Sequence, residues 1–545
     1  MARVLLGQSY YLRFDPKLWA AMQPYPPLGT LYAASYLRAQ GHEVGLFDAM
    51  LAESETGWIE ALRRQRPRFA VLYEDNFNYL SKMCLLRMRE AAFRMLSAAR
   101  EEGCVTIVCG SDATDNATRY LDRGADYVIL GEGEITLGEL LDSLGGRADH
   151  PARRVRPPAE IAGLAFRGSD GELVDTGRRP NVRDLDALPF PAWDLVDVDR
   201  YRAAWARHGR FSMNMVTTRG CPFHCNWCAK PIWGQRYAVR SPGNVAAELA
   251  WLHATYRPDH ISFADDILGL DPAWLQAFAI AVDELGARTP FKCLSRADLL
   301  LRDGEIEALK AAGCEMVWTG AESGSQRVLD AMEKGTRVEQ ILEAARRLRA
   351  ADIRFGFFLQ FGYPGEGMDD IRATRRMVME AVPDDIGISV SYPLPGTKFY
   401  ERVRAELGER RNWLDSADLA MLYRGPYSTR FYRRLHSVVH KEFRLQRASG
   451  TTALSRHLAN ALRAPGSRTA LGRARDSLTL PVDRAILAVM ARLEGGPDPM
   501  SGERLADRAM ALPTIGVVGA LPARAAAPDP DRGPARDRRV PPSAA

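Results

Sequence analysis

The sequence lacks the features that mark membrane, secreted and nucleic-acid-binding proteins. Its apolar runs fall short of the ~18–20 residues that span a bilayer, and the opening MARVLLGQSYYLRFD turns polar too soon for a signal peptide. Eight cysteines in 545 residues are too sparse for a disulfide framework. The net charge is only +5 and no Lys/Arg block lies on a predicted helix face, so nucleic acid is not indicated as a partner. We therefore expect a cytoplasmic protein without a transmembrane segment.

The chain otherwise has the composition of an ordinary globular protein, with 46% hydrophobic and 26% charged residues. Its length allows three or four domains of ~100–200 residues each. Within residues 1–145, five short apolar runs alternate with amphipathic stretches, which predicts a flavodoxin-like, doubly wound parallel sheet. The predicted strands are 3–8, 43–48, 69–74, 105–110 and 127–132. Such sheets bind ligands beyond the carboxyl ends of their strands, so the loops after these runs should line one crevice.

A second alternation follows a linker that is rich in Pro and Arg. Residues 146–205 predict this linker with a small hairpin, because their prolines interrupt regular helix and strand. Residues 206–400 then predict a partial (β/α)6 TIM-type barrel, with its site at the carboxyl ends of the strands. Its strands are expected at 213–218, 260–265, 291–296, 315–320, 354–362 and 386–392. Residues 401–495 predict a helical C-terminal domain, interrupted at Pro481, and residues 513–545 a disordered tail. The expected fold class is therefore α/β.

Three cysteines lie within eight residues, directly after the first predicted barrel strand. The segment TTRGCPFHCNWCAK places Cys221, Cys225 and Cys228 in a C-x3-C-x2-C loop. Three thiolates on one short loop suit three irons of a cubane cluster and leave the fourth iron open, whereas structural zinc usually takes four ligands. A zinc knuckle with a distant fourth ligand, or unligated thiols, is the alternative. The position of the loop at the mouth of the predicted barrel favours the cluster.

This cysteine spacing, on a loop after the first strand of a partial barrel, resembles the radical S-adenosylmethionine (SAM) superfamily over about residues 210–400. The resemblance implies a [4Fe-4S] cluster on the three cysteines, with SAM bound at the open iron and cleaved by one electron to a 5′-deoxyadenosyl radical. Trp227 matches the position that packs near the adenine. Further SAM contacts are expected at strand ends, from Asp266, Arg296, Glu322, Ser323, Gly324 and Gln360. A helix N-cap is the alternative for Asp265 and Asp266, and a structural ion pair for Arg296.

The segments PPLGTLYAASYLRAQGHEVGLFDA at 26–49 and GADYVILGEGEITLGELL at 124–141 resemble the cobalamin-binding domain that precedes many radical SAM barrels. The resemblance implies cobalamin contacts from Pro27, Leu28, Gly29, Asp48, Glu74, Gly110, Ser111, Thr114, Gly131, Glu132, Gly133 and Glu134. The D-x-H-x-x-G motif is missing, so no histidine ligand to cobalt is expected from this chain. The usual G-G-x-H-x-T loop is altered to GSDAT at 110–114. A flavodoxin-like domain with another ligand, or with none, is the alternative.

Together these resemblances imply a cobalamin-dependent radical SAM enzyme, with methylation of an unactivated carbon of a secondary metabolite or lipid as the expected reaction. The expected partners are a small-molecule substrate and an electron donor, which would be a reductase, a flavodoxin or a ferredoxin. Two alternatives stay open. One is a non-methylating radical SAM cyclase or rearrangement enzyme of the same architecture. The other is an iron–sulfur binding or sensor protein without turnover.

Overall fold

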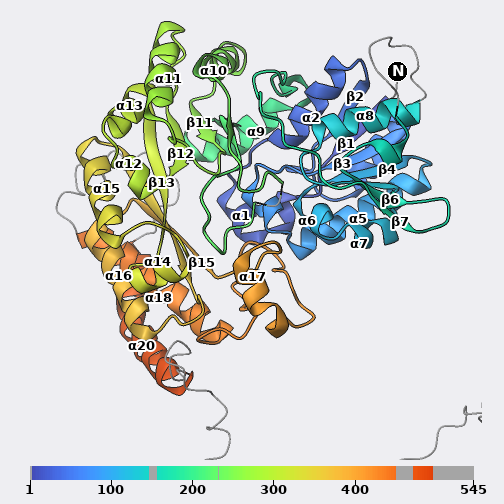
Figure 1. Ribbon diagram of the computed structural model, residues 1–545. Coiled ribbons are helices and arrows are strands. Elements are labelled where there is room, and N and C mark those ends of the chain that lie inside the picture. The colour runs from blue at the N-terminus through green and yellow to red at the C-terminus, as the bar shows by residue number, and fades with distance from the viewer. Residues whose placement is uncertain (1–2, 146–155, 231, 450–469, 495–545) are drawn as a thin grey trace, which may run out of the picture.

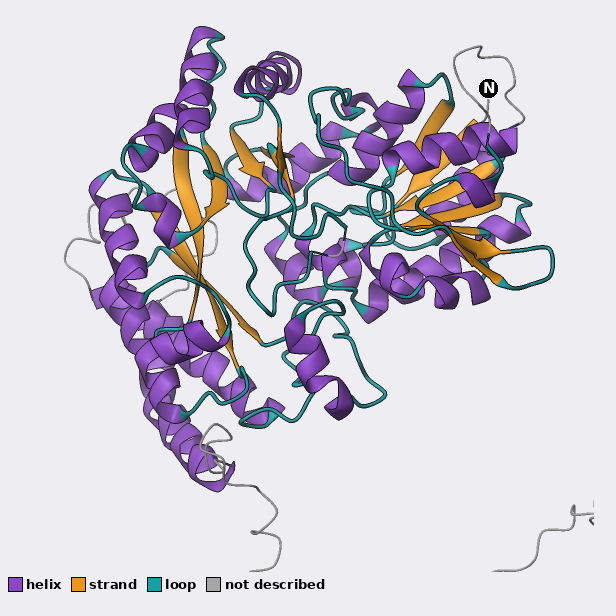
Figure 2. Cartoon of the chain, viewed as in Figure 1, coloured by secondary structure: helices purple, strands orange, loops and turns teal. Residues whose placement is uncertain are grey.

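The structure is a computed structural model that describes residues 3–145, 156–230, 232–449 and 470–494. Two sheets, each with its own helices, make up most of the molecule (Figures 1 and 2). The tail predicted for residues 513–545 lies outside the described residues. No helix in the described ranges is both long and apolar enough to cross a membrane.

The N-terminal part is built on five parallel strands in the order β2-β1-β3-β4-β5, with helices on both faces (Figure 1). This arrangement confirms the predicted doubly wound sheet. The strands are β1 (Arg3–Gly7), β2 (Glu43–Phe47), β3 (Phe69–Tyr73), β4 (Val105–Cys109) and β5 (Tyr127–Ile129). The helices are α1 (Pro16–Ala21), α2 (Leu28–Ala39), α3 (Thr56–Gln65), α4 (Tyr79–Lys82), α5 (Leu86–Glu101), α6 (Ser111–Asp115), α7 (Ala117–Asp122) and α8 (Glu134–Gly145). The connection reverses between β1 and β3, and in this fold ligands bind beyond that switch point.

The hairpin predicted in the linker is part of this sheet. Strands β6 (Leu164–Arg167) and β7 (Leu173–Asp175) continue the sheet from β5 in antiparallel pairing, which makes it seven-stranded. The predicted hairpin is therefore present, and it extends the N-terminal sheet. The pairing has a physical reason, because β5 would otherwise present an unpaired edge with free N–H and C=O groups.

The second sheet is curled and contains six parallel strands in the order β15-β14-β13-β12-β11-β8. These are β8 (Ser212–Met215), β11 (His260–Phe263), β12 (Phe291–Ser295), β13 (Cys314–Glu322), β14 (Arg354–Phe361) and β15 (Asp385–Val390), and they confirm the partial barrel. Its helices lie on the side away from the N-terminal sheet (Figure 1). They include α10 (Pro242–Tyr256), α11 (Pro272–Glu284), α12 (Ala297–Leu300), α13 (Glu305–Ala312), α14 (Gln326–Ala331), α15 (Val338–Ala350) and α16 (Met368–Ala381).

Side chains along the strands of this curled sheet point alternately to its two faces. On β14, Phe355, Phe357 and Leu359 are buried in the core that the sheet shares with the helices. The residues between them point to the opposite, inner face, where Phe358 is exposed. The inner face therefore lies toward the N-terminal part and carries the side chains that are available to a ligand.

The C-terminal part differs from the prediction in two ways. Helix α20 (Ala470–Glu494) continues through Pro481 without interruption. A proline removes one backbone hydrogen bond, and water can satisfy the freed carbonyl on this exposed helix, where Leu478 is 77% exposed. Between α17 (Lys398–Val403) and α18 (Thr429–Ser449), residues 407–428 form neither helix nor strand. We call this segment the strap.

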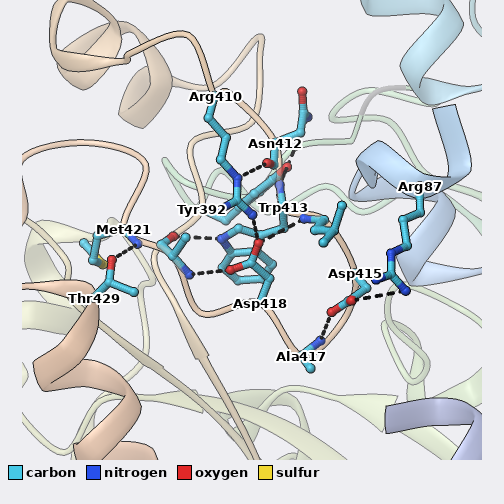
Figure 3. Close-up of polar contacts among 12 residues, drawn as sticks. Arg87, Tyr392, Arg410, Asn412, Trp413, Asp415, Ala417, Asp418, Met421 and Thr429 are labelled. Carbon is cyan, nitrogen blue, oxygen red and sulfur yellow. Dashed lines mark hydrogen bonds and ion pairs between the residues drawn. The ribbon is translucent and has the colours of Figure 1, made fainter. Parts of the chain in front are cut away.

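The strap is held in turns by its own acidic side chains. Asp418 accepts hydrogen bonds from the backbone N–H groups of Leu414 (3.0 Å) and Ala420 (3.1 Å), and Asp415 accepts one from Ala417 (3.0 Å) (Figure 3). Such side-chain contacts compete with helix formation, which explains why the helical prediction fails here.

The strap also reaches the N-terminal part. The backbone N–H of Leu86 donates to the Trp413 carbonyl at 2.9 Å, and the Ser416 hydroxyl donates to Asp15 at 2.7 Å. Arg87 forms an ion pair of 3.7 Å with the Asp415 carboxylate. Figure 3 draws this contact. The strap therefore packs against the N-terminal part of the chain.

Minor elements connect these parts. The short strands β9 (Thr218–Arg219) and β10 (Ala238–Val239) pair antiparallel beside the cysteine loop. Helix α9 (Val198–Trp205) packs under the N-terminal part, where the Trp205 indole N–H donates to the Pro24 carbonyl at 2.8 Å.

Candidate functional site

The carboxyl ends of the two sheets face each other across one interface. Lys82, which follows β3, binds Asp266, which follows β11, with Nζ 2.5 Å from Oδ1. The Asn214 side chain on β8 donates to the Pro26 carbonyl at 3.0 Å. A cavity of ≈ 270 Å³ lies at this interface, with Asp75 and Tyr79 among its lining residues from the first part and Ser262 from the barrel. Ligands of either sheet would thus come close to ligands of the other.

The three cysteines lie on the loop at the carboxyl edge of the curled sheet. Cys225 is buried, Cys221 and Cys228 are half-buried, and none forms a disulfide. No three Cys, His, Asp or Glu side chains within the described ranges converge as ligands of a single metal ion. A cubane places its cysteine sulfurs on different irons, so it does not require convergence on one point.

The start of the cysteine loop is fixed by Asp265 and Gly220. One oxygen of the buried Asp265 carboxylate accepts from the backbone N–H groups of Thr217 (2.8 Å) and Thr218 (2.7 Å). Burial raises the pKa of Asp265 to about 6. Gly220 has φ +81°, and a Cβ there would lie 2.2 Å from the Arg236 carbonyl oxygen, so only glycine fits. Asp265 is therefore an anchor of this loop.

Neither Asp265 nor Asp266 caps a helix. The next helix, α11, begins at Pro272 and is capped by Asp271, whose side chain accepts from the Ala273 N–H. The N-cap alternative for the aspartate pair is therefore wrong. The Asp266 carboxylate binds Lys82 of the N-terminal part, and its predicted contact with SAM stays a prediction.

A buried arginine joins the cysteine loop to the N-terminal sheet. Arg219 precedes Gly220 on β9, and its guanidinium donates to Glu132 at 2.5 Å and to Glu134 at 2.8 Å. All three side chains are 4–5% exposed. Charges that are removed from water in this way need partners, and here two carboxylates share one guanidinium. This buried group of one arginine and two glutamates therefore joins the carboxyl edges of the two sheets.

The far side of the cysteine loop packs on the barrel. The Asn226 backbone N–H donates to the Met332 carbonyl at 3.0 Å, and its side chain accepts from the Tyr363 hydroxyl at 3.0 Å. Trp227 is partly buried against the cluster of Tyr363, Phe399 and Tyr423 side chains. The loop is thus held at both sides by groups that are not themselves metal ligands. Such support fixes the position of thiolate ligands.

Arg296 lies against the cysteine loop, as expected for a residue of this site. Its guanidinium carbon is 3.6 Å from the centroid of the Phe223 ring, and Nη1 is 3.9 Å from the Cys225 sulfur. It also pairs with Asp298 at 3.0 Å and donates to the Lys334 carbonyl at 3.0 Å. The structural ion pair is therefore present, and the same positive charge faces the thiol.

Glu322 has an unusual backbone conformation at the end of β13. It is a non-glycine residue with φ +55°, next to an irregularity in the pairing of β13 with β14. Its buried carboxylate accepts from the Lys334 ammonium at 2.9 Å, and this partner together with Cys225 raises the pKa of Lys334. Strained backbone of this kind persists where the surrounding structure holds it and is frequent at functional sites.

The other predicted SAM residues differ in what they face. Ser323 is fully buried, and its hydroxyl lies 3.1 Å from that of Thr374 on α16. Gly324 donates its N–H to the same hydroxyl at 2.9 Å, so both residues bind the helix layer. Gln360 donates to Ser391 at 3.0 Å near the carboxyl end of β14. Their roles as SAM ligands stay predictions.

All residues predicted to contact cobalamin follow the carboxyl ends of β1 to β5, so the topology brings them to one edge. Pro27, Leu28 and Gly29 begin α2, and the Gly29 N–H donates to Asp75 at 2.9 Å.

The Glu74 carboxylate accepts from the Ser9 N–H at 3.1 Å across the switch point, and burial raises the pKa of Glu74 to about 7. Burial also raises the pKa of Asp48, whose carboxylate accepts from the Tyr201 hydroxyl at 2.5 Å.

The glycines of this edge are required by packing inside the protein. A Cβ on Gly133 would lie 2.5 Å from the Cys109 sulfur, and one on Gly110 would lie 2.8 Å from the side chain of Glu74. Thr114 accepts from the Gly131 N–H at 3.1 Å, which ties the two loops together. Glycine at these positions thus has a structural reason that does not depend on a cofactor.

Two buried polar atoms at this edge indicate a ligand. The Asn76 side-chain oxygen and the Ser111 hydroxyl lie after neighbouring strands, and neither has a hydrogen-bond partner in the part of the chain that the structure describes. Buried polar groups are nearly always paired, so a polar ligand at this edge would satisfy them. The edge therefore fits a large polar cofactor such as cobalamin.

Several residues of this interface were not singled out from the sequence. Arg219 lies two residues before Cys221, and Lys334 and Lys82 contact residues that were predicted as site residues. A basic residue beside the motif was the available signal for Arg219. Nothing local in the sequence marks the two lysines, whose partners are distant in the chain.

Comparison with known proteins agrees with this geometry. Residues 215–378 match the family model described as the Radical SAM superfamily. A protein named as an uncharacterised methyltransferase from Pyrococcus horikoshii is 29% identical over 380 residues, covering 69% of this chain and 78% of that protein. An anaerobic magnesium-protoporphyrin IX monomethyl ester cyclase from Synechocystis sp. is 27% identical over 335 residues, covering 60% of this chain and 63% of the cyclase.

A solved structure extends the likeness beyond the matched domain. The radical SAM methyltransferase TsrM from Kitasatospora setae, solved with cobalamin and a [4Fe-4S] cluster, has a TM-score of 0.60 at 18% identity. The match covers 75% of this chain and 79% of TsrM. At this identity the likeness concerns the fold, which includes both the N-terminal part and the barrel.

Proposed function

We propose that this chain, which carries a radical SAM domain, is a cobalamin-dependent enzyme that methylates an unactivated carbon of a small molecule. One observation carries the proposal. The cysteine loop at the edge of the barrel sheet is joined by Arg219 to Glu132 and Glu134 at the edge of the N-terminal sheet. A cluster held by the loop and a cofactor held by the crevice would therefore meet at one interface.

The cofactors would supply the chemistry and the chain would position it. Bound at these sites, a [4Fe-4S] cluster supplies the electron that cleaves SAM, and cobalamin supplies the methyl group. Cys221, Cys225 and Cys228 would hold the cluster, and Trp227 would shield one side of it. Arg296 carries positive charge beside Cys225, where it would attract the carboxylate of SAM.

The N-terminal edge would bind the second cofactor through polar groups. Asn76 and Ser111 would hydrogen bond to it, because their buried side-chain atoms have no partner among the described residues. Tyr79 is 61% exposed beside the interface cavity, where it would face a substrate between the two cofactors.

The test begins with cofactor content and needs no substrate. The protein is purified without oxygen, supplied with iron, sulfide and hydroxocobalamin, and desalted. We expect about four irons and one corrinoid per chain, and 5′-deoxyadenosine on addition of SAM and a chemical reductant. The rate of SAM cleavage should fall at least about a hundredfold in each of Cys221→Ala, Cys225→Ala and Cys228→Ala, because each variant removes a thiolate from the cluster.

Cys104→Ala is the matched control, since Cys104 is buried in the N-terminal core, away from the loop. It should retain both iron and cleavage. Full SAM cleavage in any of the three loop variants would refute the cluster assignment. Retained iron with no retained corrinoid would refute the cobalamin assignment alone.

A second candidate function is favoured by the similarity to the magnesium-protoporphyrin cyclase. A radical cyclase or rearrangement enzyme would share the cluster and the SAM cleavage but would transfer no methyl group. The products distinguish the two. Methylation yields S-adenosylhomocysteine together with 5′-deoxyadenosine, whereas turnover with 5′-deoxyadenosine alone would assign the chain to the second class.

A further inference from the structure

Helix α20, which lies at the outer edge of the molecule (Figure 1), carries a row of exposed aliphatic side chains. Successive members are four, four, three and four residues apart, so they share one face of a helix with 3.6 residues per turn. Single exposed apolar residues are normal, but a continuous row marks an interaction surface. We call this row the aliphatic stripe. Its members and their exposed fractions are Leu478 (77%), Val482 (59%), Ile486 (37%), Val489 (53%) and Leu493 (81%).

The opposite face of α20 packs on α18, and this contact uses the acidic side chains of α20. Asp476 pairs with Arg444 at 2.7 Å, and Asp483 pairs with Arg434 at 2.5 Å. Glu494 accepts from the last backbone N–H group of the strap at 2.9 Å. The carboxylates of α20 therefore serve contacts within the protein, while the aliphatic stripe faces outward.

The surroundings of the aliphatic stripe are positively charged. Arg475 and Arg492 are exposed near its two ends, and neither pairs with a carboxylate in the ranges that the structure describes. Helix α18 has six Lys or Arg residues and one Glu, and α20 has four Arg and three acidic residues. The whole chain has a net charge of only +5, so much of its positive excess is concentrated in this helix pair.

A hollow of ≈ 470 Å³ lies on α18 beside the aliphatic stripe, and its lining includes Arg430, Arg433 and Arg434. Arg434 also binds Asp483, which directly follows Val482 of the stripe, so the hollow and the stripe are neighbours. Guanidinium groups bind phosphate oxygens through two parallel hydrogen bonds. The hollow thus offers a place for a phosphate group next to an apolar surface.

We propose that the aliphatic stripe and its arginines form a docking surface for a membrane that contains anionic phospholipids. The aliphatic side chains would enter the boundary between head groups and acyl chains, and the arginines would bind lipid phosphates. This combination of apolar and positive groups complements such a surface in both respects. The inference does not depend on the proposed function, because docking needs neither the cluster nor cobalamin.

Charge argues against a second copy of the chain as the occupant. If two stripes paired antiparallel, Arg475 of one copy would lie near Arg492 of the other. If they paired parallel, each arginine would lie near its own counterpart. Either arrangement brings like charges together, which opposes the association.

The experiment measures binding of the full-length protein, prepared without oxygen, to sedimented lipid vesicles. One set of vesicles is phosphatidylcholine alone, and the other contains about one third phosphatidylglycerol. We expect saturable binding to the anionic vesicles, at least about tenfold tighter than to phosphatidylcholine and weaker at high salt. Leu478→Gln with Leu493→Gln should weaken this binding at least about tenfold. Its thermal midpoint should be unchanged, because both side chains are exposed.

Ile280→Gln with Leu285→Gln is the matched control, because these side chains are 59% and 52% exposed but belong to α11 and its C-cap. It should bind the anionic vesicles normally. Arg475→Gln with Arg492→Gln should weaken binding to the anionic vesicles about tenfold and leave binding to phosphatidylcholine unchanged.

Three results would overturn the proposal. The first is equal binding by the unchanged protein and the Leu478→Gln, Leu493→Gln variant, and the second is equal binding to both kinds of vesicle. The third is no vesicle binding by the full chain. Binding gained on removal of residues 495–545 would then show that the chain's own end covers the stripe, and self-association lost in the leucine variant would show that a second copy does.

The vesicle measurement is also separable from the test of the cofactors. Cys225→Ala should bind anionic vesicles as the unchanged protein does, although it should lose SAM cleavage. Retained SAM cleavage without vesicle binding would therefore contradict only the docking surface. Vesicle binding by a protein that holds neither cluster nor corrinoid would contradict only the proposed function.

Discussion

The buried carboxylic acid Glu366 makes the stability of this protein depend on pH. Glu366 lies in the turn after β14, where its carboxylate accepts from the Gly362 N–H at 2.6 Å. Burial, with Asp370 nearby, raises its pKa from 4.5 to about 8. The pKa of Glu366 is therefore higher in the folded protein than in the unfolded chain, where it is about 4.5. Protonated Glu366 contributes fully to stability below about pH 4.5, and this contribution is lost as the pH rises through 8.

Replacing this acid by its neutral analogue should flatten the pH dependence of stability. We expect the thermal midpoint of Glu366→Gln to exceed that of the unchanged protein by about 3 °C or more at pH 9, and to match it at pH 5. Differential scanning calorimetry across pH 5–9 measures both. Glu380→Gln on the exposed side of α16 is the control and should leave the pH profile unchanged. Parallel profiles for Glu366→Gln and the original protein would contradict the assignment.

At the scale of elements, the contact between the turn after β13 and helix α16 depends on the absence of a side chain. A Cβ on Gly324 would lie 2.5 Å from the Ala373 carbonyl oxygen and 2.7 Å from the Thr374 Cα, both backbone atoms of α16. Helix backbone cannot move aside as a flexible side chain can, so the whole helix would have to shift.

Gly324→Ala should therefore destabilise the barrel by about 1–3 kcal/mol. The thermal midpoint measures this, and hydrogen exchange in α16 should increase. Gly243→Ala is the matched control, because a Cβ there meets nothing within 4 Å and alanine is favoured within helix α10. An unchanged thermal midpoint in Gly324→Ala would show that α16 can shift without a loss of stability.

At the scale of the whole molecule, the strap joins the last strand end of the barrel to the N-terminal part. Trp413 is buried, its indole N–H donates to Ala420 at 2.8 Å, and its ring centroid lies 4.5 Å from that of Tyr392. The Asn412 side chain accepts from Arg89, which also binds Asp112 on the short helix α6. The strap is thus linked to the altered GSDAT segment through one arginine.

Trp413→Ala should loosen both partners of this contact. We expect the free energy of unfolding to fall by about 3–5 kcal/mol. Hydrogen exchange should become faster both in residues 409–420 and at the start of α5, where the Leu86 N–H donates to the Trp413 carbonyl. Leu414→Ala is the control, because Leu414 is 37% exposed. Faster exchange confined to the strap would show that it does not support the N-terminal part.

The sequence predicted those features that depend on neighbouring residues. The strands of both sheets were found within a few residues, because runs such as FAVLY at 69–73 are buried on all sides and have no other stable place. The cysteine loop was found because its three cysteines lie within eight residues. Glu132 and Glu134 were placed at the correct edge, and their contacts with cobalamin stay predictions. Their ion pairs with Arg219 were missed, because that partner lies 87 and 85 residues away.

Features that depend on distant contacts could not be predicted in this way. The hairpin β6–β7 was expected in a linker, and only the open edge of β5 explains its place in the sheet. Helix α20 passes through Pro481 and the strap is not helical, because solvent exposure and aspartate side chains outweigh the local preference. The stacking of Trp318 on Phe358 likewise appears only when strands 40 residues apart are paired.

The bond between Asp15 and Ser416 has a consequence for the synthesis of this protein. The two residues are 401 positions apart, so the helix that Asp15 caps leaves the ribosome long before its partner exists. At ~5–20 residues per second the wait is roughly 20–80 s. The loop around Tyr25 and Pro26 waits about half as long for its partners on β8, Ser212 and Asn214, which lie 187 and 188 positions later. The nascent chain is therefore most exposed to chaperones and to misassembly while its second half is still being translated.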